Sequence, residues 1–196
     1  MLPTDSFFTD IERVIADFAE ADRPRVRKLI QELGLVAERV PSSADRCYAY
    51  QARLYAKLQE YEQALAALDH AIQLAPLDDT LVVLRGDIYQ QANDYSQALR
   101  EYTSVVDDHP EAVTARMNRA EVLRAVGSTE GALTDINEAL KHEPRSPRLL
   151  YKRALLLVEL RRVREALADL RQVVQLSPSA ELRKKAEQRL RELGEG

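Results

Sequence analysis

The sequence predicts an all-α protein built as a helical-repeat solenoid of helix-turn-helix units. Four prolines stand 34 residues apart in the 196-residue chain, which indicates an internal repeat. The composition agrees, because 45% of the residues are hydrophobic, 31% are charged, and glycine and proline are scarce. A chain of this composition can bury a core and is not disordered. The spaced prolines are Pro76, Pro110, Pro144 and Pro178.

Small residues recur at two fixed places of a repeat frame that begins at Asp45. At the eighth and twentieth places they allow the two helices of a unit to pack closely. The frame predicts four units, 45–78, 79–112, 113–146 and 147–180. The eighth places hold Ala52, Gly86, Ala120 and Ala154, and the twentieth places hold Ala64, Ala98, Ala132 and Ala166.

Each unit is expected to contain two helices joined by a tight turn and ended by proline. Asn93 and Gly127 suit the left-handed residue that ends a first helix. The late proline stops the second helix, because it lacks an N–H and its ring clashes with the preceding turn. The predicted pairs are 45–58 with 62–75, 79–92 with 96–109, 113–126 with 130–143, and 147–160 with 164–177.

The period of 34, the small residues and the late proline resemble the tetratricopeptide-repeat (TPR) family over residues 45–180. Tyrosine at the eleventh place of two units, Tyr55 and Tyr89, fits as well. The resemblance implies a right-handed solenoid that binds proteins or peptides and has no enzymatic activity. The seventh place departs from the leucine common in the family, which leaves one packing contact in question. It holds Gln51, Arg85, Arg119 and Arg153.

Residues 1–44 do not fit the repeat frame. Apolar stripes predict a helix over 6–21 and a second one from Val26 to Val40, with a break at Pro24. We interpret them as a degenerate repeat or a cap on the first unit. An alternative is a dimerisation or docking helix, because Phe7, Phe8 and Phe18 are the only phenylalanines. By analogy with some TPR-containing bacterial secretion chaperones, the chain would then be a homodimeric secretion-chaperone-like or co-chaperone protein.

The other end, residues 181–196, is predicted to be a solvating helix with apolar residues on one side. Leu182, Ala186, Leu190 and Leu193 form that side. Charge is uneven along the chain: residues 147–196 carry 12 Lys and Arg against 7 Asp and Glu, a net +5, whereas the whole chain is −4. The basic end is either a solvated face or a contact for an acidic partner or a second copy.

Several function classes are not expected. No phosphate-binding loop or zinc motif appears, and His109 and His142, which stand near corresponding places of adjacent units, have no third metal ligand, so we expect no enzyme, cofactor or metal. An enzymatic or metal site of unrecognised type is the alternative. The net charge of −4 is too mild to indicate a nucleic-acid partner, the first repeats are acidic, and no apolar run is long enough for a membrane span. Cys47 is expected to be a small buried residue, and the cytoplasm is the default location.

The family resemblance also implies a concave groove lined by the first helices, with the second, fifth, sixth and ninth places pointing into it. In units one and two these are Arg46, Ala49, Tyr50, Arg53, Thr80, Val83, Leu84 and Asp87. In units three and four the predicted site residues are Met117, Asn118, Glu121, Arg148, Tyr151, Lys152 and Leu155. The fifth-place residues Val83, Met117 and Tyr151 predict an apolar ladder for a partner, unless they cover one another or the C-terminal helix.

One TPR subclass grips a peptide C-terminal carboxylate with Lys, Asn and Arg from successive units. Asn118, Arg148 and Lys152 stand at matching places, but Val83 and Asp87 stand where that subclass has cation and amide. Because Asp87 would repel a carboxylate, we expect no such clamp. Arg148 and Lys152 are instead expected to pair with an acidic side chain of a peptide.

Overall fold

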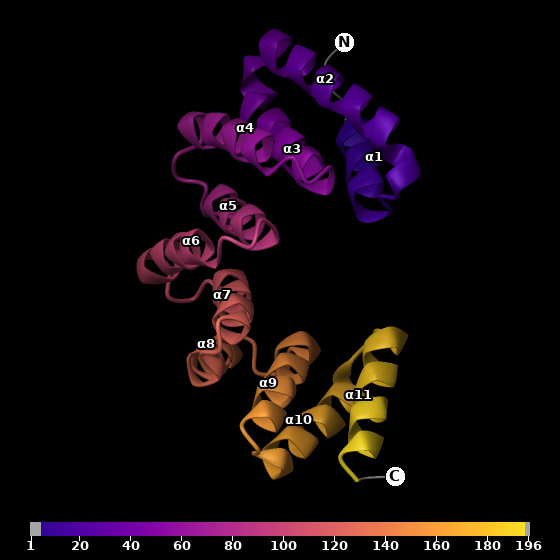
Figure 1. The fold of residues 1–196 in the computed structure, drawn as a ribbon, viewed down its shortest axis with the longest axis vertical. Coiled ribbons are helices and arrows are strands. Elements are labelled where there is room, and N and C mark those ends of the chain that lie inside the picture. Colours follow the sequence, from indigo (N-terminus) through magenta and orange to yellow (C-terminus); the bar gives the residue numbers. More distant parts are fainter. Residues whose placement is uncertain (1–4, 195–196) are drawn as a thin grey trace. The chain divides into compact units, whose positions relative to one another are not determined.

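The computed structural model describes residues 5–194, and within this range every regular element is a helix (Figure 1). The chain forms two compact units, Met1–Glu101 and Tyr102–Gly196, divided within α6. The first contains α1 (Asp5–Ala16), η1 (Glu20–Asp22), α2 (Arg23–Arg39), η2 (Pro41–Ser43), α3 (Ala44–Lys57), α4 (Tyr61–Leu74), α5 (Asp79–Gln91) and the start of α6 (Tyr95–Asp108). The second continues with α7 (Val113–Ala125), α8 (Thr129–His142), α9 (Pro147–Glu159), α10 (Val163–Leu176) and α11 (Ala180–Glu192).

The all-α helical-repeat fold is thus confirmed. From α3 to α10, each helix begins and ends within one residue of the range that the repeat frame predicts. The alanines of the eighth and twentieth places are at most 3% exposed, as close packing of paired helices requires. They are Ala52, Ala64, Ala98, Ala120, Ala132, Ala154 and Ala166.

The turn inside each pair has one recurring backbone geometry. Its fifteenth-place residue is left-handed in all four units, with φ of 62° at Gln59, 62° at Asn93, 84° at Gly127 and 61° at Arg161. The N–H of the next residue donates to the carbonyl five residues earlier, at 2.8–2.9 Å, which satisfies a free carbonyl of the first helix. Asn93 and Gly127 confirm the prediction, whereas Gln59 and Arg161 adopt this strained conformation against their residue preference.

The seventh-place arginines replace an apolar contact with an ion pair. Each reaches across its own repeat to an acidic residue of the second helix, at the twenty-third place of the repeat, at 2.6–2.8 Å. The contact that the sequence left in question is therefore polar, and it is fully satisfied at Arg119 and Arg153, whereas the buried Arg85 Nε has no hydrogen-bond partner. The pairs are Arg85 with Glu101, Arg119 with Asp135 and Arg153 with Asp169.

The N-terminal segment differs from the prediction in two respects: the first helix ends at Ala16 and not at residue 21, and the second begins at Arg23, with Pro24 inside it, and not at Val26. Two local features stabilise the start of α2: the Ala19 N–H donates to the Asp22 carboxylate at 3.0 Å, and Pro24 lies in the first turn. The predicted stripe of α2 is buried at Val26, Ile30, Leu33 and Ala37.

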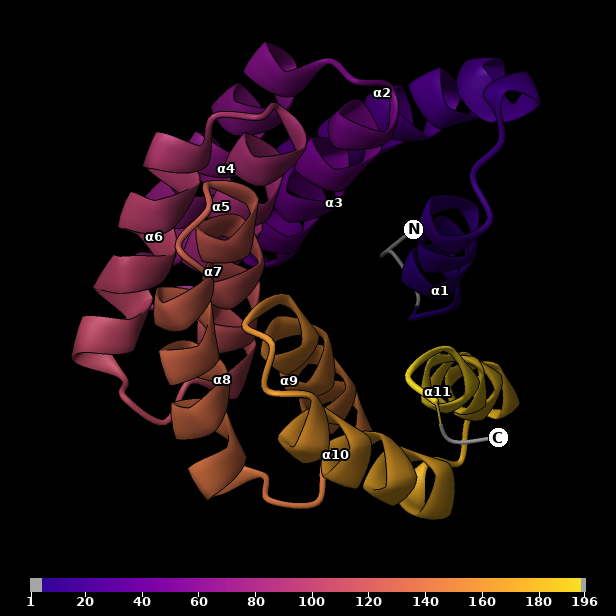
Figure 2. The ribbon, with the colours of Figure 1, turned by 60° about the horizontal axis from the view of Figure 1, so that its bottom comes forward.

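The apolar face predicted for the C-terminal helix packs as expected. Ala186 of α11 is fully buried, and Leu182, Leu190 and Leu193 pack against the core of the same unit. Figure 2 shows α11 following α10, on which it packs. No helix among residues 5–194 is long and apolar enough to cross a bilayer.

Candidate functional site

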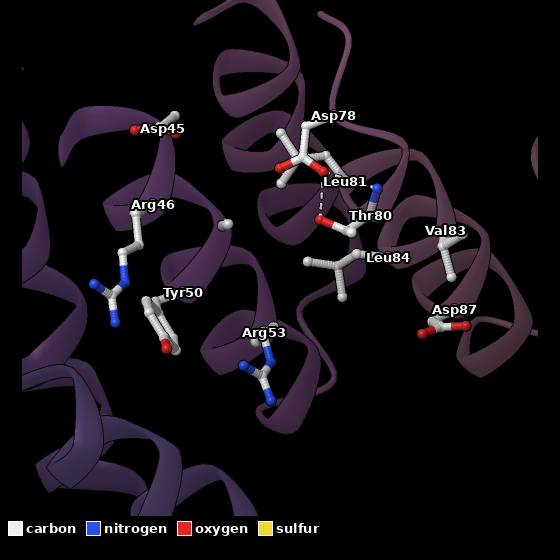
Figure 3. Close-up of a pocket in the computed structure, with 11 residues that line it drawn as sticks. Asp45, Arg46, Tyr50, Arg53, Asp78, Thr80, Leu81, Val83, Leu84 and Asp87 are labelled. Atoms are coloured by element: carbon white, nitrogen blue, oxygen red, sulfur yellow. Dashed lines mark hydrogen bonds between the residues drawn. The ribbon is translucent and has the colours of Figure 1, made fainter. Parts of the chain in front are cut away.

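A cavity of about 550 Å³ opens between α3 and α5 in the N-terminal unit (Figure 3). All eight groove places that the sequence predicts for the first two repeats line it. The structure therefore brings together Arg46, Ala49, Tyr50, Arg53, Thr80, Val83, Leu84 and Asp87, which lie on two helices and are up to 41 residues apart in sequence. The sequence analysis did not identify three further lining residues, Asp45, Asp78 and Leu81.

Helix geometry explains why these side chains converge. The four groove places of a first helix are spaced i, i+3, i+4 and i+7, so they lie on one face of that helix. The N-terminus of α5 is held at the cavity rim by Asp78, whose carboxylate accepts from the Thr80 N–H at 2.9 Å and from the Thr80 hydroxyl at 2.6 Å. The pattern Asp-x-Thr before an apolar run was the sequence signal for this cap.

The two walls of the cavity differ in charge. The α3 wall carries Arg46 and Arg53 together with Asp45, whereas Asp87 of α5 and its N-cap residue Asp78 lie on the opposite wall. Leu84 projects between them, facing the side chain of Arg53 (Figure 3). The Arg53 guanidinium lies 5.5 Å from the centre of the Tyr50 ring, a cation–π distance. The cavity thus offers apolar contact between a mainly basic wall and an acidic wall.

Helix α1 covers one end of this surface. Its Phe8 ring stacks on the Tyr50 ring with centroids 5.3 Å apart, and the Arg46 guanidinium carbon lies 3.9 Å from the Phe8 centroid. The Tyr50 hydroxyl donates to the Glu12 carboxylate at 2.5 Å. Burial, and then this hydrogen bond, raise the pKa of Tyr50. Tyr50, predicted to face an open groove, is instead buried under α1.

The phenylalanines that might have formed an exposed docking helix are not fully available. Phe8 is only 2% exposed and belongs to a core shared with Ile11 and Leu33, while Phe7 and Phe18 are partly buried against it. This packing within one chain is what the capping interpretation expects. Cys47 lies in the same core, and burial raises its pKa to about 11.

In the C-terminal unit, Met117 does not face an open groove as predicted. Its side chain is 8% exposed and belongs to the core that Ala120, Leu149 and Leu150 also form. A residue covered by its own unit cannot hold a partner without repacking. The ladder proposed for Val83, Met117 and Tyr151 therefore lacks an open middle member.

Other predicted residues of this unit already have intramolecular neighbours. The Lys152 ammonium pairs with the Glu121 carboxylate, and Tyr151 packs against the core. The Tyr151 hydroxyl, and then Glu192, raise the pKa of Arg189 in α11. Tyr151 therefore interacts with the C-terminal helix, which was the alternative to its facing a partner. Arg148 is exposed and Asn118 is half-buried.

Leu155 lines a second, smaller cavity of about 240 Å³, and α11 forms one of its walls. Val158 of α9 and Leu193 of the C-terminal segment supply apolar walls. Arg124 and Glu159 at its edge form an ion pair at 2.6 Å. Because these charges neutralise each other, this cavity offers less polar recognition than the one between α3 and α5.

Comparison with known structures finds similar folds. The tetratricopeptide repeat protein YrrB, described as having an unusual peptide-binding site, is 17% identical with a TM-score of 0.62, and 86% of each chain is covered. MamA (residues 41 to the end) from Desulfovibrio magneticus is 16% identical with a TM-score of 0.64, covering 85% of this chain and 95% of that one. At these identities the likeness shows the fold.

A shorter similar structure is the first TPR of Spaghetti (RPAP3) bound to the HSP90 peptide SRMEEVD. It is 23% identical with a TM-score of 0.54, covering 59% of this chain and 89% of that one. No curated protein matches this chain by sequence. The tetratricopeptide-repeat pattern itself matches residues 46–76, 83–141 and 122–181, which is more than half of the chain. The chain therefore belongs to the tetratricopeptide-repeat family.

Proposed function

We propose that this protein is a non-enzymatic scaffold or adaptor that binds a peptide segment of a partner protein in the cavity between α3 and α5. The observation that carries the proposal is the convergence of eight repeat places on one hollow. A few charged groups around an apolar floor are the usual composition of a site that orients a ligand and holds it by burial. We also place the protein in the cytoplasm, with which a single buried cysteine that can form no disulfide within the chain is compatible.

Relatives of the same fold support this proposal. YrrB is described as having a peptide-binding site, and the first TPR of Spaghetti is bound to an HSP90 peptide. Both are helical-repeat proteins, and each is described with a peptide or a peptide-binding site. A peptide is therefore the ligand class that agrees best with both the fold and the cavity.

The charges of the cavity narrow the peptide chemistry. We infer a segment whose apolar side chain contacts Leu84, with an acidic residue toward Arg53 and a basic residue toward Asp87. Opposite charges at fixed separation would set its direction. A free C-terminal carboxylate next to Asp87 would be repelled, so an internal segment fits better than a chain end.

The alternative, a secretion-chaperone-like or co-chaperone dimer formed through the N-terminal helices, has less support. Such a dimer needs an apolar surface on α1, but Phe8, Ile11, Val14 and Ile15 are all buried within one chain.

The test is selection of peptides from a displayed random library on the full chain, followed by titration calorimetry. Leu84→Ala and Arg53→Ala should each weaken binding of the selected peptides by about tenfold, as expected for central interface residues. Arg100→Ala is the matched control, because Arg100 is an exposed arginine of α6 outside the cavity. Equal affinity of all three variants and the wild type would contradict the proposal.

A further inference from the structure

Helix α1 is seated on the repeats in the way that a bound helix would be. It contacts α3 through Arg46 and Tyr50, and both residues also line the cavity. These are the second and sixth places of the first repeat, which belong to the surface assigned above to ligands. The cavity and the seat of α1 are therefore adjoining parts of one surface.

The contacts of α1 define a short recognition pattern. The Phe8 ring contacts both the Tyr50 ring and the Arg46 guanidinium, which also lies 5.8 Å from the Tyr50 centroid, and Glu12, one helical turn later, accepts from the Tyr50 hydroxyl at 2.5 Å. Residues at i and i+4 lie on the same side of a helix, so one helix face presents both groups together. An aromatic ring and a carboxylate match a surface made of tyrosine and arginine.

The attachment of α1 to the rest of the unit is limited. Helix α2 packs along much of α3, whereas the backbone of α1 comes close to α3 over only a short stretch. Residues 17–22 connect α1 to α2, and their one regular element is the single-turn η1. Side chains of α1, chiefly Phe8, Ile11 and Ile15, hold it in place. Release of α1 therefore mainly breaks side-chain contacts and uncovers the part of the core that α1 shares with α2 and α3.

We propose that Arg46 and Tyr50 form a docking site for a partner helix that carries an aromatic residue and, four residues later, a carboxylate, and that α1 occupies this site in cis. The inference rests on the proposed function, since it extends the ligand surface beyond the cavity. A partner helix with this pattern and a similar apolar face replaces α1. While α1 is bound, the site is available only in the small fraction of molecules in which α1 has detached.

The experiment uses a synthetic, end-blocked and fluorescently labelled peptide of residues 5–17 as the probe. Its anisotropy is titrated with the wild-type chain and with a Phe8→Ala chain, whose own α1 is loosened. The probe should bind the Phe8→Ala chain at least about tenfold more tightly, because the competing helix is weakened. Probes with Phe8→Ala or Glu12→Ala should bind more weakly by about tenfold, while the Arg13→Ala probe, changed at an exposed position, should bind unchanged.

Hydrogen exchange on the unmodified chain gives a second measurement that does not depend on the folding of a variant. Saturating probe should increase amide exchange in residues 5–16 and leave α3 protected. Binding without increased exchange in α1, or equal affinity for both chains, overturns the proposal. The proposal is also overturned if the probe does not bind a Phe8→Ala chain that has wild-type helicity. Self-association of the wild-type chain that Phe8→Ala abolishes would also overturn it, in favour of exchange of α1 between copies.

These results separate the two proposals. If library peptides need Leu84 but the α1 probe never displaces α1, the cavity is the binding site and the inference about α1 is wrong. If the probe displaces α1 but no selected peptide depends on Leu84 or Arg53, the docking site stands and the cavity proposal fails.

Discussion

Arg153 donates two hydrogen bonds, each of 2.7 Å, to the carboxylate of Asp169, which is only 2% exposed. The same guanidinium reaches Asn137 of the preceding unit at 3.2 Å. Arg119 makes the equivalent contacts with Asp135 and with a threonine of the preceding unit. Each arginine therefore ties one first helix to two second helices, and Asp169 raises the pKa of the Arg153 guanidinium.

The first prediction concerns this ion pair. Arg153→Leu should lower the free energy of unfolding by about 3–5 kcal/mol, because it leaves the buried Asp169 carboxylate without its partner. The double variant Arg153→Leu with Asp169→Leu should recover most of that loss, since it removes both charges together. Urea denaturation followed by circular dichroism measures both.

Arg162→Ala serves as the control for the ion pair. Arg162 pairs with Glu165 at the surface, where solvent screens ion pairs and they contribute little to stability. A loss for Arg153→Leu no larger than that for Arg162→Ala would show that the seventh-place arginine does not stabilise the repeat.

The second prediction concerns helix packing at the twentieth place. Ala98 is fully buried, so Ala98→Leu should overpack its helix pair and cost about 1–3 kcal/mol of stability, measured by thermal unfolding. Ala66→Leu, on the exposed side of α4, should leave the melting temperature nearly unchanged. Equal melting of the two variants would contradict the close packing described above.

The third prediction concerns α11. Deletion of residues 181–196 should uncover the apolar surface on which Leu182, Leu190 and Leu193 pack, and so promote aggregation. Light scattering during storage and heating detects this. A shortened chain that stays monodisperse and melts at the wild-type temperature would show that α11 is dispensable.

The fourth prediction uses the pKa of Cys47, which burial raises to about 11 from an ordinary value of 9.0. Between these pH values the unfolded chain ionises its thiol and the folded chain does not, so ionisation favours unfolding. The thiol contribution to stability should therefore be intact below about pH 9 and fall between pH 9 and 11.

Tyrosine and lysine side chains titrate in the same range, so the measurement compares wild type with Cys47→Ala. The wild type should lose more stability than the variant as the pH rises from 9 to 11. Parallel losses in both chains would mean that Cys47 ionises equally in the folded and unfolded states.

Much of the fold could be predicted from the sequence, because the repeat depends on local chemistry. The spaced prolines end the second helices, and the small residues at the eighth and twentieth places decide how closely helices approach. The left-handed turn could be predicted at Asn93 and Gly127, because asparagine and glycine favour this conformation. The same turn at Gln59 and Arg161 followed only from their place in the repeat, since neither residue favours it.

The ion-pair pattern was also present in the sequence, although it was not recognised. Arginine at the seventh place and an acid at the twenty-third recur together in the last three repeats, and the first repeat has Gln51 and Ala67 instead. That joint change was the available signal. Only the structure showed that the two places face each other, because they belong to different helices.

The state of the candidate site depended on the tertiary structure. The sequence alone determined which side chains share a face of each first helix, since 3.6-residue periodicity is a local property. It could not determine that α1 covers Tyr50, that the core covers Met117, or that Lys152 meets Glu121. Those outcomes depend on which distant segment covers a surface, and that is decided by the burial of apolar side chains between helices far apart along the chain.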